Sequence, residues 1–285
     1  QALLLNTTAN NNTAVGNGSL KVNTTGADNT AFGKSALAAN TTAANNSAFG
    51  ATSLDANTTG TQNNAFGTNA LTANTTASYN AAFGTSSLAA NTTGASNSAF
   101  GANTLAANTT ASNNTAMGYN AGTAITTGTE NTVVGALAGD AITTGNENTA
   151  VGKTALSADT KGHRSVAIGQ GTLATQNFTS STNSYNTAVG FQAGNAVTTG
   201  TLNTFIGANS GDAVTTGGQN TALGQNSLGS NTTASNNTAI GYVALVANTT
   251  GASNVAVGAA SLDANTTGAN NTGVGYNALT SNTTA

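Results

Sequence analysis

The chain has 285 residues and a net charge of −3, with 5% of its residues charged and no Pro, Cys or Trp. Its five basic residues form no stripe, which argues against nucleic-acid binding. No segment approaches the roughly 20 consecutive apolar residues that cross a bilayer. A composition dominated by Asn, Thr, Ala, Gly and Ser is typical of disorder unless a repeat builds a core.

A 17-residue repeat runs along the chain from end to end. Each of its sixteen copies carries a marker glycine, and the single longer step, between Gly169 and Gly190, places a four-residue insertion at about 176–184. The unit is too short for a helical hairpin but long enough for strands and turns. We therefore predict an all-β fold in which residues 1–285 form one β-solenoid of sixteen coils, with two short strands per coil and parallel stacking.

The residue before each marker glycine is always large and apolar, and we predict that it points into the core. Five consecutive Phe in this column would stack coil on coil as an aromatic ladder. The residue one earlier is nearly always Ala, so strand alternation predicts an outer face of methyl groups that suits contact with another chain. The aromatic core residues predicted in this way are Phe32, Phe49, Phe66, Phe83 and Phe100.

A second apolar position lies four residues after the marker glycine. It is Leu in twelve coils and Gly in four, and those four alone carry Ile or Val three positions later, where the others generally have Asn. The exchange moves one apolar side chain along the coil, as expected if each coil contributes two large apolar groups to the core. The predicted core residues here include Leu37, Leu54 and Leu71, and Ile125, Ile142, Val197 and Val214.

Two columns of Asn recur with the same period. One lies four residues before the marker glycine in fifteen of sixteen coils, Ser165 being the exception, and the other opens an Asn-Thr-Thr triplet. Stacked Asn side chains can hydrogen-bond along the stack and satisfy polar groups where the coil turns. We predict ladders that include Asn29, Asn46 and Asn63 in the first column and Asn40, Asn57 and Asn74 in the second.

The Asn-Thr-Thr triplets also match the acceptor pattern for N-glycosylation. In a eukaryotic or archaeal host they would carry a coat of sugar. In most bacteria or in a phage they would have no role beyond turn chemistry.

Residues that could carry chemistry do not converge on one site. The single histidine, His163, lies beside Lys161 and Arg164, and no second His or clustered carboxylate accompanies it. The acidic residues Asp55, Asp140, Asp212 and Asp263 share one register but lie in distant coils, and we expect solubilising charges. We predict no enzyme activity, no catalytic residue, no cofactor and no metal. Aromatic residues that could line one edge and contact sugars or a partner are Tyr119, Phe191, Tyr242 and Tyr276.

Residues 165–174, Ser-Val-Ala-Ile-Gly-Gln-Gly-Thr-Leu-Ala, resemble the head-domain repeat of trimeric autotransporter adhesins. The recurrent Asn-Thr-Ala-Val-Gly with a following Ala-Leu is similar to repeats of phage and bacterial tail-fibre proteins. The resemblance covers the whole chain. It implies a left-handed β-roll in which three parallel chains pack together and serve attachment to a host or surface.

These observations favour a structural fibre or filament with an adhesive role, extracellular, on a cell surface or on a virion. The expected partners are other copies of the chain, as a homotrimer or a head-to-tail filament, and a host-surface glycan or protein. One alternative is an ice-binding solenoid that orders water on a Thr and Asn surface. A polysaccharide-cleaving solenoid is the other, and the short coils and scattered acidic residues speak against it.

Overall fold

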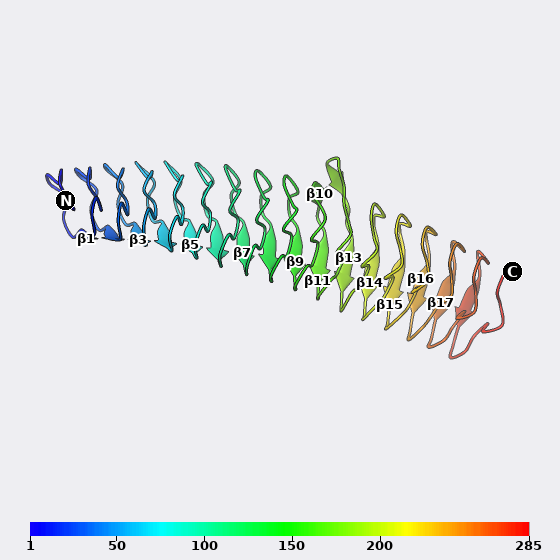
Figure 1. Ribbon diagram of the computed structural model, residues 1–285. Helices are drawn as coiled ribbons and strands as arrows, with labels where there is room; N and C mark the ends of the chain where they lie inside the picture. The colour runs from blue at the N-terminus through cyan, green and yellow to red at the C-terminus, as the bar shows by residue number, and fades with distance from the viewer. Residues whose placement is uncertain (285) are drawn as a thin grey trace. The chain divides into compact units, whose positions relative to one another are not determined.

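The computed structural model describes residues 1–284. This part of the chain is all-β, with eighteen short strands and no helix. It divides into two compact units, Gln1–Thr144 and Gly145–Ala285. In each unit the successive coils stack in parallel, strand upon strand, as a β-solenoid (Figure 1). The predicted fold class is therefore confirmed.

Each coil of the N-terminal unit places one three-residue strand beside that of the next coil. The register advances by one repeat, so that Ala31 lies opposite Ala48 and Phe32 opposite Phe49. The strands are β1 (Thr13–Val15), β2 (Thr30–Phe32), β3 (Ser47–Phe49), β4 (Asn64–Phe66), β5 (Ala81–Phe83), β6 (Ser98–Phe100), β7 (Thr115–Met117) and β8 (Thr132–Val134).

The C-terminal unit repeats this arrangement and adds a second, two-stranded parallel sheet of β10 (Gly162–His163) and β12 (Thr182–Asn183). The second sheet holds the predicted insertion, which lies within residues 176–184. In this second sheet Gly162 pairs with Thr182, and in the main stack Val166 pairs with Thr187, so both sheets keep a parallel register across the insertion. The main strands are β9 (Thr149–Val151), β11 (Val166–Ile168), β13 (Thr187–Val189), β14 (Thr204–Ile206), β15 (Thr221–Leu223), β16 (Thr238–Ile240), β17 (Val255–Val257) and β18 (Thr272–Val274).

A coil contains one regular strand in this stack, where the sequence predicted two. The rest of the coil passes through left-handed turns, with φ of 58° at Ser35, 51° at Leu37 and 60° at Asn45. Backbone bonds between coils continue through these turns, as from Leu37 N to Ser53 O at 3.0 Å. The turn residues thus hold the stack without forming a second strand.

The marker glycine is required by backbone stacking. Gly33 has a φ of 145°, a conformation that L side chains rarely adopt, and a Cβ added to it would overlap the carbonyl oxygen of Gly50 in the next coil. The same conformation and close approach recur at Gly50, Gly67 and Gly84. The marker glycine therefore recurs once per coil because the backbones of neighbouring coils come into close contact at this position.

The strand faces the opposite way from our prediction. Ala31 is fully buried, and Phe32, the next residue, is 53% exposed. Leu37 is fully buried as well, and an aromatic ring takes the place of Ala31 only at Phe205, where Gly replaces Leu in the adjacent coils. The prediction that the column before the marker glycine forms the core is wrong: Phe32, Phe49 and Phe100 are exposed, and Phe66 and Phe83 are half-buried.

The second predicted apolar position does form the core. At most 1% of the surface of these residues is exposed, and they are Leu37, Leu54, Leu71, Ile125, Ile142, Val197 and Val214. Since the column before the marker glycine points outward, most coils contribute one large apolar side chain to the interior, not two.

Two coils carry a larger residue on the inner face of the strand, Val133 and Phe205, both buried. Each lies between two Gly residues that replace Leu. A Cβ on Gly194 would lie 2.8 Å from Phe205 Cδ2, and a Cβ on Gly139 would lie 2.8 Å from Val133 Cγ1. The interior volume is thus conserved by exchange between the strand and the opposite turn.

Candidate functional site

The exposed apolar column that precedes the marker glycines is the main candidate for an interaction surface. We name it the outer ladder. Exposed fractions reach 46% at Val15, 50% at Met117 and 45% at Leu223. In the N-terminal unit it consists of Val15, Phe32, Phe49, Phe66, Phe83, Phe100, Met117 and Val134. In the C-terminal unit it consists of Val151, Ile168, Val189, Ile206, Leu223, Ile240, Val257 and Val274.

Phenylalanine rings stack along the N-terminal part of the outer ladder. Ring centroids of Phe49 and Phe66 lie 4.6 Å apart, those of Phe66 and Phe83 lie 4.7 Å apart, and their planes agree within 8°. The stack continues to Phe100 at 4.8 Å, whereas Phe32 lies 6.2 Å from Phe49. Because each ring sits one strand spacing above the next, the stacking follows directly from the parallel register.

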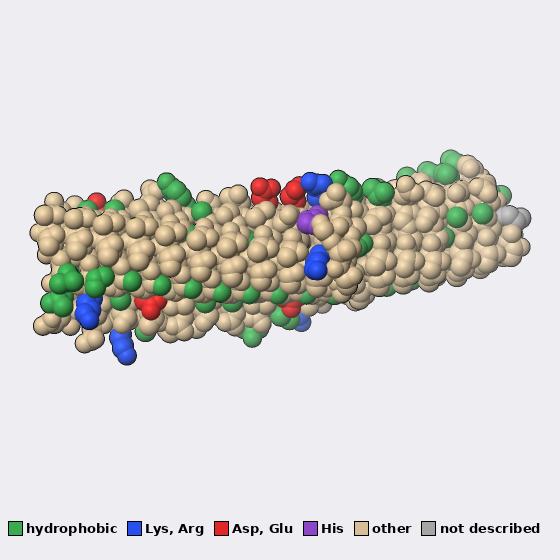
Figure 2. Space-filling view, turned by 90° about the horizontal axis from the view of Figure 1, so that it is seen from above, with side chains coloured by type: hydrophobic (Ala, Val, Ile, Leu, Met, Phe, Trp, Pro, Cys, Tyr) green, Lys and Arg blue, Asp and Glu red, His purple; other side chains and the backbone are tan. Residues whose placement is uncertain are grey.

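The surroundings of the outer ladder carry little charge. The first residue of each strand in the main stack shares the outer face and is Thr, Ser, Asn, Ala or Val, as at Thr30, Ser47 and Val166. Figure 2 shows that the face seen from above is mostly polar side chains and backbone, with few charged groups. A contiguous exposed apolar strip, unlike single exposed residues, marks an interaction site.

Four exposed aromatic residues directly follow a marker glycine and so come two positions after a residue of the outer ladder. Their exposed fractions are 58% at Tyr119, 48% at Phe191, 57% at Tyr242 and 78% at Tyr276. They lie on the surface, as the sequence analysis supposed.

Both predicted Asn ladders are present, and both lie inside the coil. The backbone N–H of Asn46 donates to Asn29 Oδ1 at 3.0 Å, and Asn40 Nδ2 donates to Asn23 Oδ1 at 2.9 Å. The two columns meet at one acceptor, since Asn29 Nδ2 and Asn40 Nδ2 donate to Ala43 O at 2.8 and 3.0 Å. The pattern continues through Asn57, Asn63 and Asn74, which are buried like the others.

Burial of the second ladder bears on glycosylation of the Asn-Thr-Thr triplets. Asn40, Asn57 and Asn74 are 0% exposed, and their amide nitrogens donate within the interior. The folded chain therefore presents no acceptor nitrogen at these triplets. Asn6, in contrast, is exposed.

Other residues continue the interior polar column through the coil that contains the insertion. Asp159 replaces Asn, is 1% exposed, and accepts hydrogen bonds at Oδ1 from Gly162 N and Phe178 N, both at 3.0 Å. Gln176 Nε2 donates to Asp159 Oδ2 at 2.7 Å and to Ser165 Oγ at 2.8 Å. These bonds explain why Ser replaces Asn at residue 165 and how the insertion joins the stack.

A charged cluster covers the surface beside the insertion. Arg164 donates from Nε and Nη2 to the two carboxylate oxygens of Glu147 at 3.0 and 3.1 Å, and from Nη1 to Tyr185 OH at 3.0 Å. The hydrogen bond from Arg164 lowers the pKa of Glu147 below its ordinary value. The guanidinium carbon also lies 5.8 Å from the Tyr185 ring centroid.

His163, purple in Figure 2, lies beside this cluster and makes two hydrogen bonds. Its Nδ1 accepts from the backbone N–H of Asn146 at 3.0 Å, and its Nε2 lies 2.8 Å from Ser181 Oγ. The sequence analysis noted His163 beside Lys161 and Arg164 and did not predict these hydrogen bonds. Alignment of the repeats could have predicted a hydrogen-bonding role for His163, because serine occupies the equivalent position in several other coils.

The four acidic residues that share a register are half-buried. Burial raises the pKa of Asp140 and of Asp212. Asp140 and Asp263 each keep one carboxylate oxygen buried without a hydrogen-bond partner. These carboxylates are less solvated than solubilising surface charges would be.

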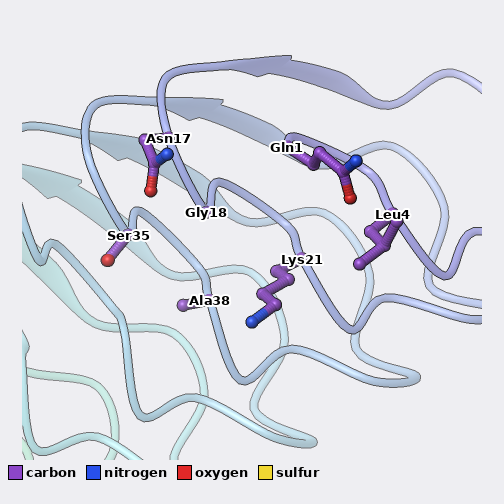
Figure 3. A pocket seen from close by; sticks show the side chains of 7 residues that line it. All are labelled: Gln1, Leu4, Asn17, Gly18, Lys21, Ser35 and Ala38. Atoms are coloured by element: carbon purple, nitrogen blue, oxygen red, sulfur yellow. The ribbon is translucent and has the colours of Figure 1, made fainter.

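In residues 1–284, no group of three or more His, Cys, Asp or Glu side chains could hold a metal ion. In the same residues, no helix has the length and hydropathy of a membrane-spanning segment. A hollow between the first coils contains a single ionisable side chain, that of Lys21, and its lining side chains come from separate turns (Figure 3): Gln1, Leu4, Asn17, Gly18, Lys21, Ser35 and Ala38.

Fold and surfaces together define a class, the all-β tandem-repeat solenoids, here with an interior of Leu and Asn columns and an apolar ladder outside. No protein-family model, curated protein or solved structure matches the chain.

Proposed function

We propose that the chain is a structural, fibre-forming repeat protein displayed outside a cell or on a virion. In this proposal copies of the chain associate side by side through the outer ladder, as a homotrimer, and the assembly serves attachment. Its main support is the outer ladder itself, one large apolar side chain in every coil that is exposed or half-buried.

The apolar area that association buries determines how many residues of the outer ladder must take part in the contact. Covering apolar surface contributes about 25 cal/mol per Å², so a half-exposed Phe or Ile contributes roughly 1–2 kcal/mol. The eight ladder residues of one unit then contribute on the order of 8–16 kcal/mol, against an association cost of about 4–15 kcal/mol. A short contact would not form a stable complex, whereas a contact along most of the ladder would.

Self-association fits this surface better than a different partner does. A second copy in parallel orientation has the same repeat spacing and presents a ladder residue at every level. Three copies around a common axis would cover all ladders at once, in keeping with the trimeric left-handed β-rolls that the sequence resembles. Attachment would then use the surfaces that remain outside.

We also propose that the chain has no catalytic activity. Catalysis requires a nucleophile, an acid–base pair or a metal held in one cleft. The clustered ionisable groups, Glu147 and Arg164, are paired with each other on an exposed surface.

The test compares the parent chain with a ladder variant by sedimentation velocity. Phe49→Ser, Phe66→Ser and Phe83→Ser are combined, and Tyr79→Ser, 62% exposed but away from the ladder, serves as the control. The parent and the control should sediment as trimers and the ladder variant as a monomer with an unchanged β circular-dichroism spectrum. A folded ladder variant that remains trimeric would refute the role of the outer ladder.

Ice binding is a second candidate, and one observation favours it. The second Thr of each triplet is exposed, and Thr25, Thr42 and Thr59 repeat at successive levels of the stack. The first Thr is not available, because Thr24 Oγ1 donates to Thr41 O at 3.1 Å. A single column of free hydroxyls thus forms the candidate surface. A freezing-point depression that disappears in a variant with Val at residues 25, 42 and 59 would support ice binding over attachment.

A further inference from the structure

A recurrent backbone hydrogen bond joins neighbouring coils on the outer turn. At the residue eleven positions after the marker glycine, the backbone N–H donates to a serine hydroxyl at the equivalent position of the next coil. The pairs are Thr61 to Ser78 at 2.9 Å, Ala95 to Ser112 at 3.0 Å and Gly218 to Ser235 at 3.0 Å.

His163 takes the place of that serine in its own coil. The backbone N–H of Asn146 donates to His163 Nδ1 at 3.0 Å, the same length as two of the serine bonds. An N–H donor requires a lone pair on Nδ1, so the imidazole is neutral with its proton on Nε2. Nε2 then donates to Ser181 Oγ at 2.8 Å.

His163 therefore connects three segments. Asn146 belongs to the preceding coil, His163 to β10, and Ser181 to the insertion. The insertion is fixed further by Ser184 N, which donates to His163 O at 3.0 Å. A single side chain thus bonds on one side to the regular stack and on the other to the irregular loop.

We propose that His163 is a proton-sensitive clamp that fixes the insertion to the stack at neutral pH and releases it in acid. A second proton on the ring occupies Nδ1 and turns the acceptor into a donor that faces the N–H of Asn146. Rotation of the ring does not restore the bond, because both nitrogens of an imidazolium are donors. Serine at the equivalent position of other coils has no such response.

Charged groups around His163 are few. Glu147 comes from the preceding coil, and Arg164 holds both of its carboxylate oxygens. Lys161 and Arg164 lie on the same segment as His163. The buried carboxylate of Asp159 accepts from Gly162 N and Phe178 N below β10. The insertion contributes the uncharged Ser181, and Tyr185 holds Arg164.

Release should stay local. Asp159, Gln176 and Ser165 form bonds that do not involve the imidazole, and Phe178 is 5% exposed beneath them. The main sheet through β11 and β13 is likewise independent of His163. We therefore expect the loop from Thr179 to Ser181 and the N–H of Asn146 to loosen while the stack persists.

Amide hydrogen exchange at neutral and acidic pH, corrected for the intrinsic exchange rate, tests the clamp in the full chain. The matched control is His163→Ser, which installs the residue of the equivalent coils and cannot titrate. In the parent chain, protection of the Asn146 amide should fall roughly fivefold on acidification, the effect of losing one hydrogen bond. The His163→Ser chain should keep its protection, and so should the serine-capped amide of Thr61 in both chains.

Two results would overturn the proposal: equal protection of the parent Asn146 amide at both pH values, or an equal loss in His163→Ser. Nitrogen-15 NMR of the parent imidazole keeps the test decisive if the variant fails to fold. The neutral ring should show an unprotonated Nδ1, and its protonation should coincide with the shift of the Asn146 amide. A protonated Nδ1 at neutral pH, or titration without that shift, would also overturn it.

Discussion

The ring of Phe205 lies against Gly211, so closely that a Cβ on the glycine would come within 2.6 Å of the ring Cδ1. In most coils Leu takes the place of that glycine and Ala the place of Phe205. The two side chains occupy the same interior volume, so the size tolerated at one position depends on the residue at the other.

Phe205→Ala should destabilise the chain by about 3–5 kcal/mol, because it leaves a ring-sized cavity. Gly211→Leu alone should also destabilise, because the new side chain meets the ring. The double variant recreates the pair found in coils such as that of Leu37 and should recover most of the loss. Chemical denaturation of the four chains gives the coupling, and additive losses would contradict the shared volume.

Removal of one amide from the interior column should cost more than removal of a surface hydroxyl. Asn57 Nδ2 donates to Asn40 Oδ1 at 3.1 Å and to Gly60 O at 2.9 Å, and Asn57 Oδ1 accepts from Asn74 at 2.9 Å. Asn57→Ala should lower the free energy of unfolding by about 1–3 kcal/mol or more, because its partners stay buried and unpaired. The control Thr42→Ala, at an exposed position, should stay within about 0.5 kcal/mol. Equal losses in the two variants would mean that the column does not stabilise the fold.

A methyl group on a marker glycine should be more disruptive than its size suggests. Gly84→Ala places a Cβ against the carbonyl of Gly101 and requires a φ of 141°. We expect a loss of at least about 2–4 kcal/mol in thermal or denaturant unfolding. Gly229→Ala is the matched control, since its φ is ordinary and Ala38 occupies the equivalent position of another coil. A mild effect at Gly84 would show that the coils can stack with wider spacing.

Acidification should not unfold the stack. Burial raises the pKa of Asp140 and Asp212, so the folded state binds these protons more tightly than the unfolded state does. Their contribution is favourable at low pH and is lost as pH rises from the ordinary Asp pKa of 3.8 through the raised value. The melting temperature should therefore fall as the pH rises through that window.

Replacement of the two carboxylates checks this sign. Asp140→Asn and Asp212→Asn together should raise the melting temperature at neutral pH and flatten its dependence on pH. The control Asp55→Asn shares the register, but its carboxylate accepts a hydrogen bond from Thr72 Oγ1 at 2.8 Å. A parent chain that loses stability in acid, with no change in the double variant, would contradict the assignment.

Periodicity made much of the fold predictable from the sequence. Backbone stacking forces a glycine at each level, the interior needs a Leu or its displaced equivalent, and buried amides need neighbours of their own kind. Each of these requirements recurs in every coil and therefore appears in the sequence as a residue type repeated at the same position of the repeat. The insertion within residues 176–184 was visible as a break in those columns.

The direction of the strand was not predictable from hydrophobicity alone. Both neighbours, Ala31 and Phe32, are apolar, and the larger one was assigned to the core. The width of the interior decides the matter, and only packing reveals that width. A clue did exist, because Val133 and Phe205, the enlarged inner residues, occur only where Gly replaces Leu nearby.

The candidate site was predictable only in part. Asn ladders were recognised, but their place in the interior was not, because turns and interiors both favour paired amides. Contact with other chains was expected of the small Ala face, but Ala31 and its equivalents are buried, and the contact surface that we propose is the apolar outer ladder. The hydrogen bonds of His163 were not predicted, because one of its partners is a backbone group in another coil, which no local motif records.

Light scattering on the purified chain over a wide dilution series tests the central claim, that the outer ladder is a surface for other copies. One chain has a mass of 27.4 kDa, so three copies (3 × 27.4) have about 82 kDa. The account predicts the trimer mass across the series. A stable mass of 27.4 kDa at the highest concentration would contradict it.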